Sequence, residues 1–327
     1  MRIDPALCAL RSDPAPQRLA QARIEQAKQA WQGGPLVAGV AAGLKLYSGG
    51  EHLNDCGELA ALFAKQARGP EYVSKLMDHF LVALAEEPLG QMPFRHDFRE
   101  GYSTLVLATE GSATLSLHCS VPEANTAASP ASSVRFSSGE RHEVAIAGRA
   151  DIRLIERKLR TMTPASMTER VVQTEAGDVL ALDSDLQATI IDKIYGRLLR
   201  LRLVRAPSDP APSQQYLIET GELIHQAAGD QGESRQELML ALLGRMKRAD
   251  AAPIMAEMTN EGGDHLRWQA QRECLALDAA SGFAALSKMA ENTGDSLATP
   301  ACALRAQLLE TYPALEALNQ ETAPCPA

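Results

Sequence analysis

The sequence is poor in aromatic residues and lacks the short motifs that mark several large enzyme classes. Phe, Trp and Tyr make up only 4% of its 327 residues. Any core must therefore be filled mainly by Leu, Ala, Val and Met, which favours helix-on-helix packing over an aromatic-rich barrel. No G-x-S-x-G, P-loop or G-x-G-x-x-G motif is present. Neither a hydrolase nucleophile elbow nor a glycine-rich phosphate cradle is therefore indicated.

Paired cysteines and long apolar runs are also missing. The six cysteines are scattered and include no C-x-x-C pair, which is typical of reduced thiols and not of a disulfide framework. The first residues, MRIDPALCALRSDPAP, show no basic-then-apolar signal pattern. The longest uncharged apolar run, 33–44, is well below the roughly 20 residues that a membrane-spanning helix needs. We therefore expect a cytoplasmic protein without a membrane partner.

The charge of the sequence is negative and unevenly distributed. The net charge is −9, and residues 221–327 carry eight basic and fifteen acidic side chains, a balance of −7. An acidic region of this kind repels phosphate backbones. The composition therefore argues against nucleic acid as a partner.

The hydrophobic periodicity changes twice along the chain. Apolar residues recur at helical spacing in 73–84, whereas every second residue is apolar in 113–120, the pattern of a half-buried strand. Helical spacing returns after Ser234, which together with Glu237 matches a capping box. We expect an α+β multidomain protein with an N-terminal helical unit, a central antiparallel β-sandwich or jelly-roll-like domain and C-terminal helical hairpins. The corresponding ranges are 1–88, 89–230 and 231–327.

Short strand-like segments, separated by Gly and Asp turns such as Gly148, follow one another through the middle of the chain. About ten short strands at this spacing are typical of an antiparallel sandwich or jelly roll. The segments are 104–108, 113–120, 134–136, 143–147, 151–155, 170–174, 179–182, 187–191, 198–204, 216–218 and 223–225.

A repeat is visible in the C-terminal third. The segment 263–277 is echoed at 294–308, and Asp264 matches Asp295. Asp264 is suited to capping the helix that follows it. The pattern resembles HEAT-type helical repeats, which stack paired helices. The resemblance implies that Asp264 and Arg267 are structural and tie neighbouring hairpins together, although the second copy lacks the arginine.

A second resemblance concerns the β-rich region. The stretch GDVLALDSDLQATII, 177–191, places a Gly-Asp turn between two strands and is similar to cupin-type jelly rolls. The metal motif of that family, an H-x-H followed by Glu, is absent here. The resemblance therefore implies a cupin-like fold without the usual cupin metal site.

The seven histidines show no H-x-H, H-E-x-x-H or i,i+4 spacing. His118, His142 and His225 lie on or near predicted strands, so the fold could bring them together as a three-histidine metal site. Isolated histidines are the favoured interpretation because the spacing of metal ligands is missing. We therefore expect no metal and no cofactor.

Four further residues are candidates for binding. Arg200 and Arg202 alternate with leucines and so share one sheet face. They could hold a small anionic ligand. The favoured alternative is that they meet the acidic helices at a domain interface or form a solvated face. Trp268 and Arg272 are candidates for contacting a protein partner. Packing of Trp268 against the β region is the competing interpretation.

These observations predict a non-catalytic binding or scaffolding protein. Its β-sandwich and helical repeats would hold a protein or a small anionic ligand. The alternative is a cupin-type metal-dependent enzyme, for example an iron oxygenase, whose histidine ligands are dispersed in the sequence.

Overall fold

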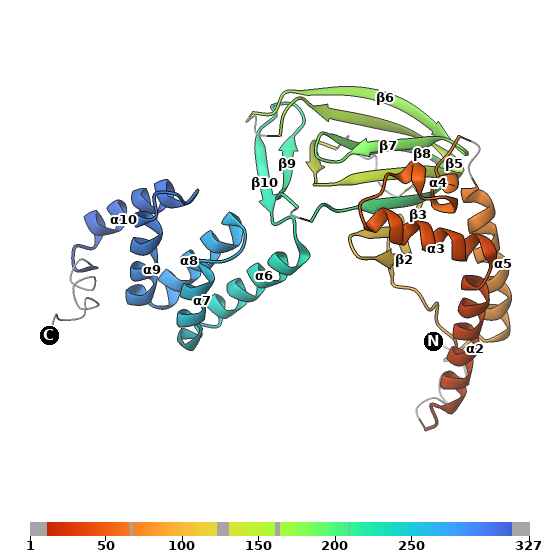
Figure 1. Cartoon of the computed structure of the whole chain (residues 1–327), viewed down its shortest axis with the longest axis horizontal. Helices are drawn as coiled ribbons and strands as arrows, with labels where there is room; N and C mark the ends of the chain where they lie inside the picture. Colours follow the sequence, from red (N-terminus) through yellow and green to blue (C-terminus); the bar gives the residue numbers. More distant parts are fainter. Residues whose placement is uncertain (1–11, 66–67, 123–130, 161–163, 209, 316–327) are drawn as a thin grey trace. The chain divides into compact units, whose positions relative to one another are not determined.

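The computed structural model describes residues 12–65, 68–122, 131–160, 164–208 and 210–315 (Figure 1). The chain forms two compact units, the first made of Met1–Ser208 with Gln215–Ile224 and the second of Asp209–Gln214 with His225–Ala327. Helices come first, antiparallel strands follow and helices return, which confirms the predicted fold class. The boundary expected at Pro88 lies inside the first unit, and the division into three domains stays a prediction.

The N-terminal helices enclose a cluster of aromatic rings. They are α2 (Ala15–Gln32), α3 (Pro35–Ser48), α4 (Glu58–Leu62) and α5 (Gly69–Glu86), with a 3-10 turn, η1 (Leu53–Asp55), between α3 and α4. Trp31 is buried and makes edge-on contacts with Tyr72 at 5.5 Å, Phe80 at 6.4 Å and Phe94 at 5.6 Å between ring centroids. A chain poor in aromatics thus places four of them at one point of its core.

The strands form two sheets. They are β1 (His96–Arg99), β2 (Tyr102–Glu110), β3 (Ala113–Ser120), β4 (Ser133–Phe136), β5 (Glu140–Arg157), β6 (Met167–Glu175), β7 (Val179–Asp183), β8 (Gln187–Arg205), β9 (Ser213–Leu217) and β10 (Leu223–Ala227). The larger sheet has the order β1-β2-β3-β8-β5-β6, and β7 also pairs with β5. The smaller sheet has the order β10-β9-β4. The larger sheet carries the candidate site.

Two long strands, β5 and β8, form the middle of the larger sheet. They are 18 and 19 residues long and pair along most of their length. The sequence pattern predicts two short strands in place of each, with Gly148 as a turn, and this prediction is wrong. Gly148 lies in a bulge of β5, with φ at +92°, and a Cβ there would lie 1.8 Å from the carbonyl oxygen of Arg197. Only glycine fits this position, so it preserves the strand.

The central strands of the larger sheet are buried on both faces. On one face Leu115, Leu117, Leu201 and Leu203 share a core with the N-terminal helices. The opposite face of the same strands carries polar side chains, and many of these are buried as well. A buried polar face of a sheet requires internal partners for its charges and hydrogen bonds.

The second unit is a set of helices with α8 at its centre. They are α6 (Gln231–Arg245), η2 (Ala249–Ala251), α7 (Ala252–Met258), α8 (Asp264–Leu277), α9 (Ala279–Glu291) and α10 (Ala298–Thr311). Leu266 and Cys274 of α8 belong to one apolar cluster with α6 and α7, and Leu275 packs on another with α9 and α10. The two clusters therefore share α8.

Two predicted helix caps are wrong. The capping box at Ser234 does not open α6, because the helix begins earlier and Asp230 accepts a bond of 2.9 Å from the amide of Glu233. Asp264 makes no capping bond to its own helix. The capping position of α8 belongs to Gly263, whose amide donates to the Glu233 carboxylate at 2.6 Å.

Arg267, in contrast, does link several helices. Its guanidinium pairs with Asp295 and donates to the carbonyl oxygen of Thr259 at 2.9 Å. Asp295 also accepts a bond of 3.0 Å from the amide of Leu297, at the start of α10. Arg267 therefore connects the end of α7 and the start of α10 through α8, which is a structural role, while the HEAT-type repeat stays a prediction.

Candidate functional site

The register of the larger sheet groups polar side chains on its buried face. Ser116 of β3 lies opposite Arg202 of β8, and His118 lies opposite Arg200. On the other side of β8, Glu143 of β5 lies opposite Arg202. Residues two apart on a strand point to the same face, so Arg200 and Arg202 do share a face, as their alternation with leucines predicts.

Glu143 is the centre of this buried face. Arg200 donates to one carboxylate oxygen at 2.7 Å, and Arg202 donates to the other at 2.7 Å. Arg141 lies 3.5 Å from Glu143 and donates to the hydroxyl of Thr189 at 2.8 Å. The side chains of Glu143 and Arg200 are 4% and 5% exposed. The partner of Arg200 and Arg202 is thus a carboxylate of the same sheet.

The charges in this cluster do not balance. Three guanidinium groups, from Arg141, Arg200 and Arg202, surround the carboxylate of Glu143. Burial would raise the pKa of Glu143, but the three arginines outweigh it and lower the pKa to about 2. Burial lowers the pKa of Arg141 to about 10 and also lowers the pKa of Arg200. Among the described residues an excess of buried positive charge therefore remains, and desolvation makes it costly.

His118 extends the cluster toward β2. Its Nδ1 contacts the hydroxyl of Tyr102 and lies 3.3 Å from that of Thr104, while its Nε2 lies 2.8 Å from the hydroxyl of Ser116. Burial, followed by the charges of the nearby Arg202 and Arg200, lowers the pKa of His118 to about 3. The ring is therefore neutral at physiological pH and adds no charge to the cluster.

Other arginines near the sheet have partners of their own. Arg205 donates to the carbonyl oxygens of Tyr47 and Glu51 at 2.7 and 2.8 Å, and its guanidinium pairs with Glu140 at 2.9 Å. Arg153 pairs with carboxylates at 3.1 and 3.0 Å. These side chains stabilise the fold and do not add to the excess charge around Glu143.

The three histidines of the alternative metal site do not form a cluster. His118 lies opposite Arg200, whereas His142 lies opposite Leu203, so the two project from opposite faces of the sheet. His142 is instead within 6.2 Å of the Tyr47 ring, measured between centroids. His225 is exposed on β10. In the part of the chain that the structure describes, no group of His, Cys, Asp and Glu side chains is arranged to hold a metal ion.

The predicted partner contacts lie on the central helix of the second unit. Trp268 is partly buried and packs on the apolar cluster around Phe283 and Leu286. Arg272 is exposed on the same helix. The role of both in binding a partner stays a prediction, but Trp268 has a structural role within its own unit.

Sequence reasoning missed Glu143, Arg141 and the polar residues around His118. One signal was available, because Ser116, His118 and Ser120 alternate with apolar residues in β3. Such alternation indicates a solvent-facing side, yet these residues are buried. Only the pairing of β3 with β8 shows that this polar side meets a row of arginines.

Comparisons with known proteins show likeness to solved structures only. No protein-family model and no curated protein matches the chain. A 7S globulin from Momordica charantia has 14% identity and a TM-score of 0.27 over 38% of this chain and 35% of its own. A vicilin from Capsicum annuum has 14% identity and a TM-score of 0.27 over 38% of this chain and 33% of its own. A cupin superfamily protein from Desulfitobacterium hafniense has 17% identity and a TM-score of 0.24 over 34% of this chain and 84% of its own.

The chain thus spans about a third of the length of the two plant proteins. At these identities the matches concern the fold alone and leave the function open. Among the residues placed by the structure, no helix is long and apolar enough to cross a membrane.

Proposed function

We propose that this chain is a non-catalytic binding protein whose β-sandwich holds a small anionic ligand beside Arg141, Arg200 and Arg202. The observation that carries the proposal is the charge that the described residues leave uncompensated, since three buried or half-buried guanidinium groups face the carboxylate of Glu143. Isolated buried charges are costly unless they are paired. An anion bound among the arginines would restore the balance.

The chemistry of arginine narrows the class of ligand. A guanidinium group matches carboxylate and phosphate oxygens with two parallel hydrogen bonds. The Nε atom of Arg200 is buried and has no hydrogen-bond partner among the described residues, so this donor lacks a partner that a ligand would supply. The hydroxyl of Ser120 is also buried without a hydrogen-bond partner among the described residues. It lies on the same side of β3 as His118. These features support a small carboxylate or phosphate ligand.

Thermal unfolding in the presence of inorganic phosphate or succinate tests the proposal. A ligand that binds only the folded state raises the melting temperature with concentration. Glu143→Gln raises the excess positive charge and should increase the anion-dependent rise, although it lowers the starting stability. Arg202→Gln should reduce that rise. Arg197, exposed on the same strand, provides the matched control Arg197→Gln, which should leave it unchanged.

A network with a purely structural role gives a different result. Both Glu143→Gln and Arg202→Gln would then lower the melting temperature, and neither would change its dependence on anions. A wild-type protein that does not respond to phosphate, to succinate or to other small carboxylates would refute the proposal.

The helical unit carries the second part of the proposed role, which is to bind a protein partner. The link from Arg267 to Asp295 supports a HEAT-like stack of hairpins. The exposed Arg272 supports the prediction that this stack offers contacts to a partner. A cytoplasmic location remains our expectation for the whole chain.

A further inference from the structure

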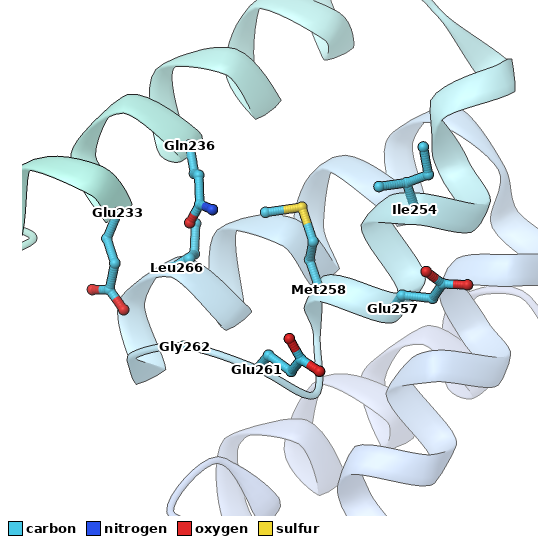
Figure 2. Close-up of a pocket in the computed structure, with 8 residues that line it drawn as sticks. All are labelled: Glu233, Gln236, Ile254, Glu257, Met258, Glu261, Gly262 and Leu266. Atoms are coloured by element: carbon cyan, nitrogen blue, oxygen red, sulfur yellow. The ribbon is translucent and has the colours of Figure 1, made fainter.

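The helical unit contains a pocket that combines an apolar floor with an acidic rim. Its volume is about 330 Å³. Figure 2 shows that its walls come from α6, α7, α8 and the turn before α8, and that Met258 extends from α7 toward Gln236 of α6. We call the following lining residues the acidic groove: Glu233, Gln236, Ile254, Glu257, Met258, Glu261, Gly262 and Leu266.

The carboxylates of the acidic groove differ in how they are used. Glu233 accepts the amide of Gly263 and so fixes the turn before α8. Glu257 and Glu261 are exposed, and neither has an ion-pair partner within the described ranges. No lysine or arginine is among the described residues that line the groove. Its rim therefore has a negative charge that the described part of the unit leaves uncompensated.

An apolar ridge continues from the acidic groove along α6. Met239 lies one turn beyond Gln236, and Leu242 and Met246 follow at spacings of three and four residues, which makes them neighbours on the helix surface. All three side chains are more than half exposed, as is Ile254 in the groove. From Gln236 to Met246 the ridge is about 15 Å long at the rise of an α-helix. Large apolar side chains exposed side by side are typical of interaction surfaces.

We propose that the acidic groove and this ridge bind a basic amphipathic helix of a partner protein. The apolar face of such a helix would cover Ile254 and the α6 ridge, and its lysines or arginines would pair with Glu257 and Glu261. A second copy of this chain fits less well. Residues 221–327 have a net charge of −7, so this region of one copy repels the same region of another. The inference rests on the proposed partner-binding role of the helical unit and is independent of the anion site.

A synthetic peptide of about 16 residues, roughly 24 Å as a helix, tests the surface. It carries leucines at i, i+3, i+4 and i+7 and lysines elsewhere, and its binding to the full-length protein is measured by fluorescence anisotropy. Glu257→Lys with Glu261→Lys should weaken binding about tenfold or more, and Ile254→Ser should weaken it by a similar factor. The control, Glu291→Lys with Glu310→Lys, makes the same change in net charge on exposed positions outside the groove and should stay within about twofold of wild type.

Charge reversal separates recognition from loss of structure. A peptide with glutamates in place of the lysines should bind the Glu257→Lys and Glu261→Lys variant better than it binds the wild type. Equal weakening in the control variant would show non-specific attraction and overturn the assignment of the groove, while the proposed partner-binding role would stand. Absence of binding to the full-length protein would overturn the inference, and so would self-association that Ile254→Ser abolishes. None of these outcomes affects the anion test, which uses variants of the β-sandwich.

Discussion

Replacing His118 by glutamine should make the protein less sensitive to mild acid. In the unfolded chain a histidine takes up its proton near pH 6.5, whereas burial and the neighbouring arginines lower the pKa of folded His118 to about 3. Between these values the unfolded state binds the extra proton, so stability falls as the pH falls. One unit of pKa difference is worth about 1.4 kcal/mol, so the full effect is on the order of 5 kcal/mol.

The range from pH 6.5 to 5 gives the clearest measurement. Over this range the protonation of His118 in the unfolded state should lower the free energy of unfolding by about 2 kcal/mol. Glu143, whose folded pKa is lowered to about 2, begins to contribute only as the pH falls through the range in which an unfolded glutamate takes up its proton. Burial also lowers the pKa of His142, which adds a loss of the same sign. His118→Gln should therefore remove only part of the pH dependence.

Urea unfolding at a series of pH values provides the assay. The free energy of unfolding of wild type should decrease steadily from pH 6.5 to 5, and that of His118→Gln should decrease much less, whatever its starting value. His79 is exposed, and His79→Gln serves as the control that retains the wild-type slope. If His118→Gln and wild type lose stability in parallel over this range, then His118 is not held neutral in the folded protein.

Three substitutions test the fold. Arg267→Ala should lower the free energy of unfolding by on the order of 3 kcal/mol, because Asp295 is left nearly buried without its partner. Asp264→Ala, at a position with no capping bond, should cost less than about 0.5 kcal/mol. Gly148→Ala should lower the free energy of unfolding by about 1–3 kcal/mol or more, because of backbone strain and the clash with the carbonyl oxygen of Arg197. All are measured by chemical unfolding, and a harmless Gly148→Ala would contradict the bulge in β5.

Local patterns in the sequence predict much of this fold. Two-residue alternation predicts β3 over its full length, and the helical spacing around Phe80 predicts α5. The patterns fail where long-range pairing decides the structure. Gly148 is typical of a turn, yet β8 pairs with β5 on both sides of it and keeps the strand continuous. A bulge and a turn use the same glycine, and only the partner strand distinguishes them.

The surroundings of Arg200 and Arg202 also depend on long-range pairing that the sequence pattern does not show. Alternation alone places Arg200 and Arg202 on one face, but it cannot say whether that face meets solvent, another domain or the interior. The answer depends on Glu143, more than fifty residues earlier in the chain, which reaches the arginines only because β5 pairs with β8 in one register. A shift of that register by one residue would bring Val144 or His142 opposite Arg202 and turn Glu143 toward the helices. Because a carboxylate buried among leucines without its arginines is costly, the Glu143 cluster should itself help to fix the register. The ion pairs of Glu143 with Arg200 and Arg202 therefore favour the pairing that the sequence pattern leaves undetermined.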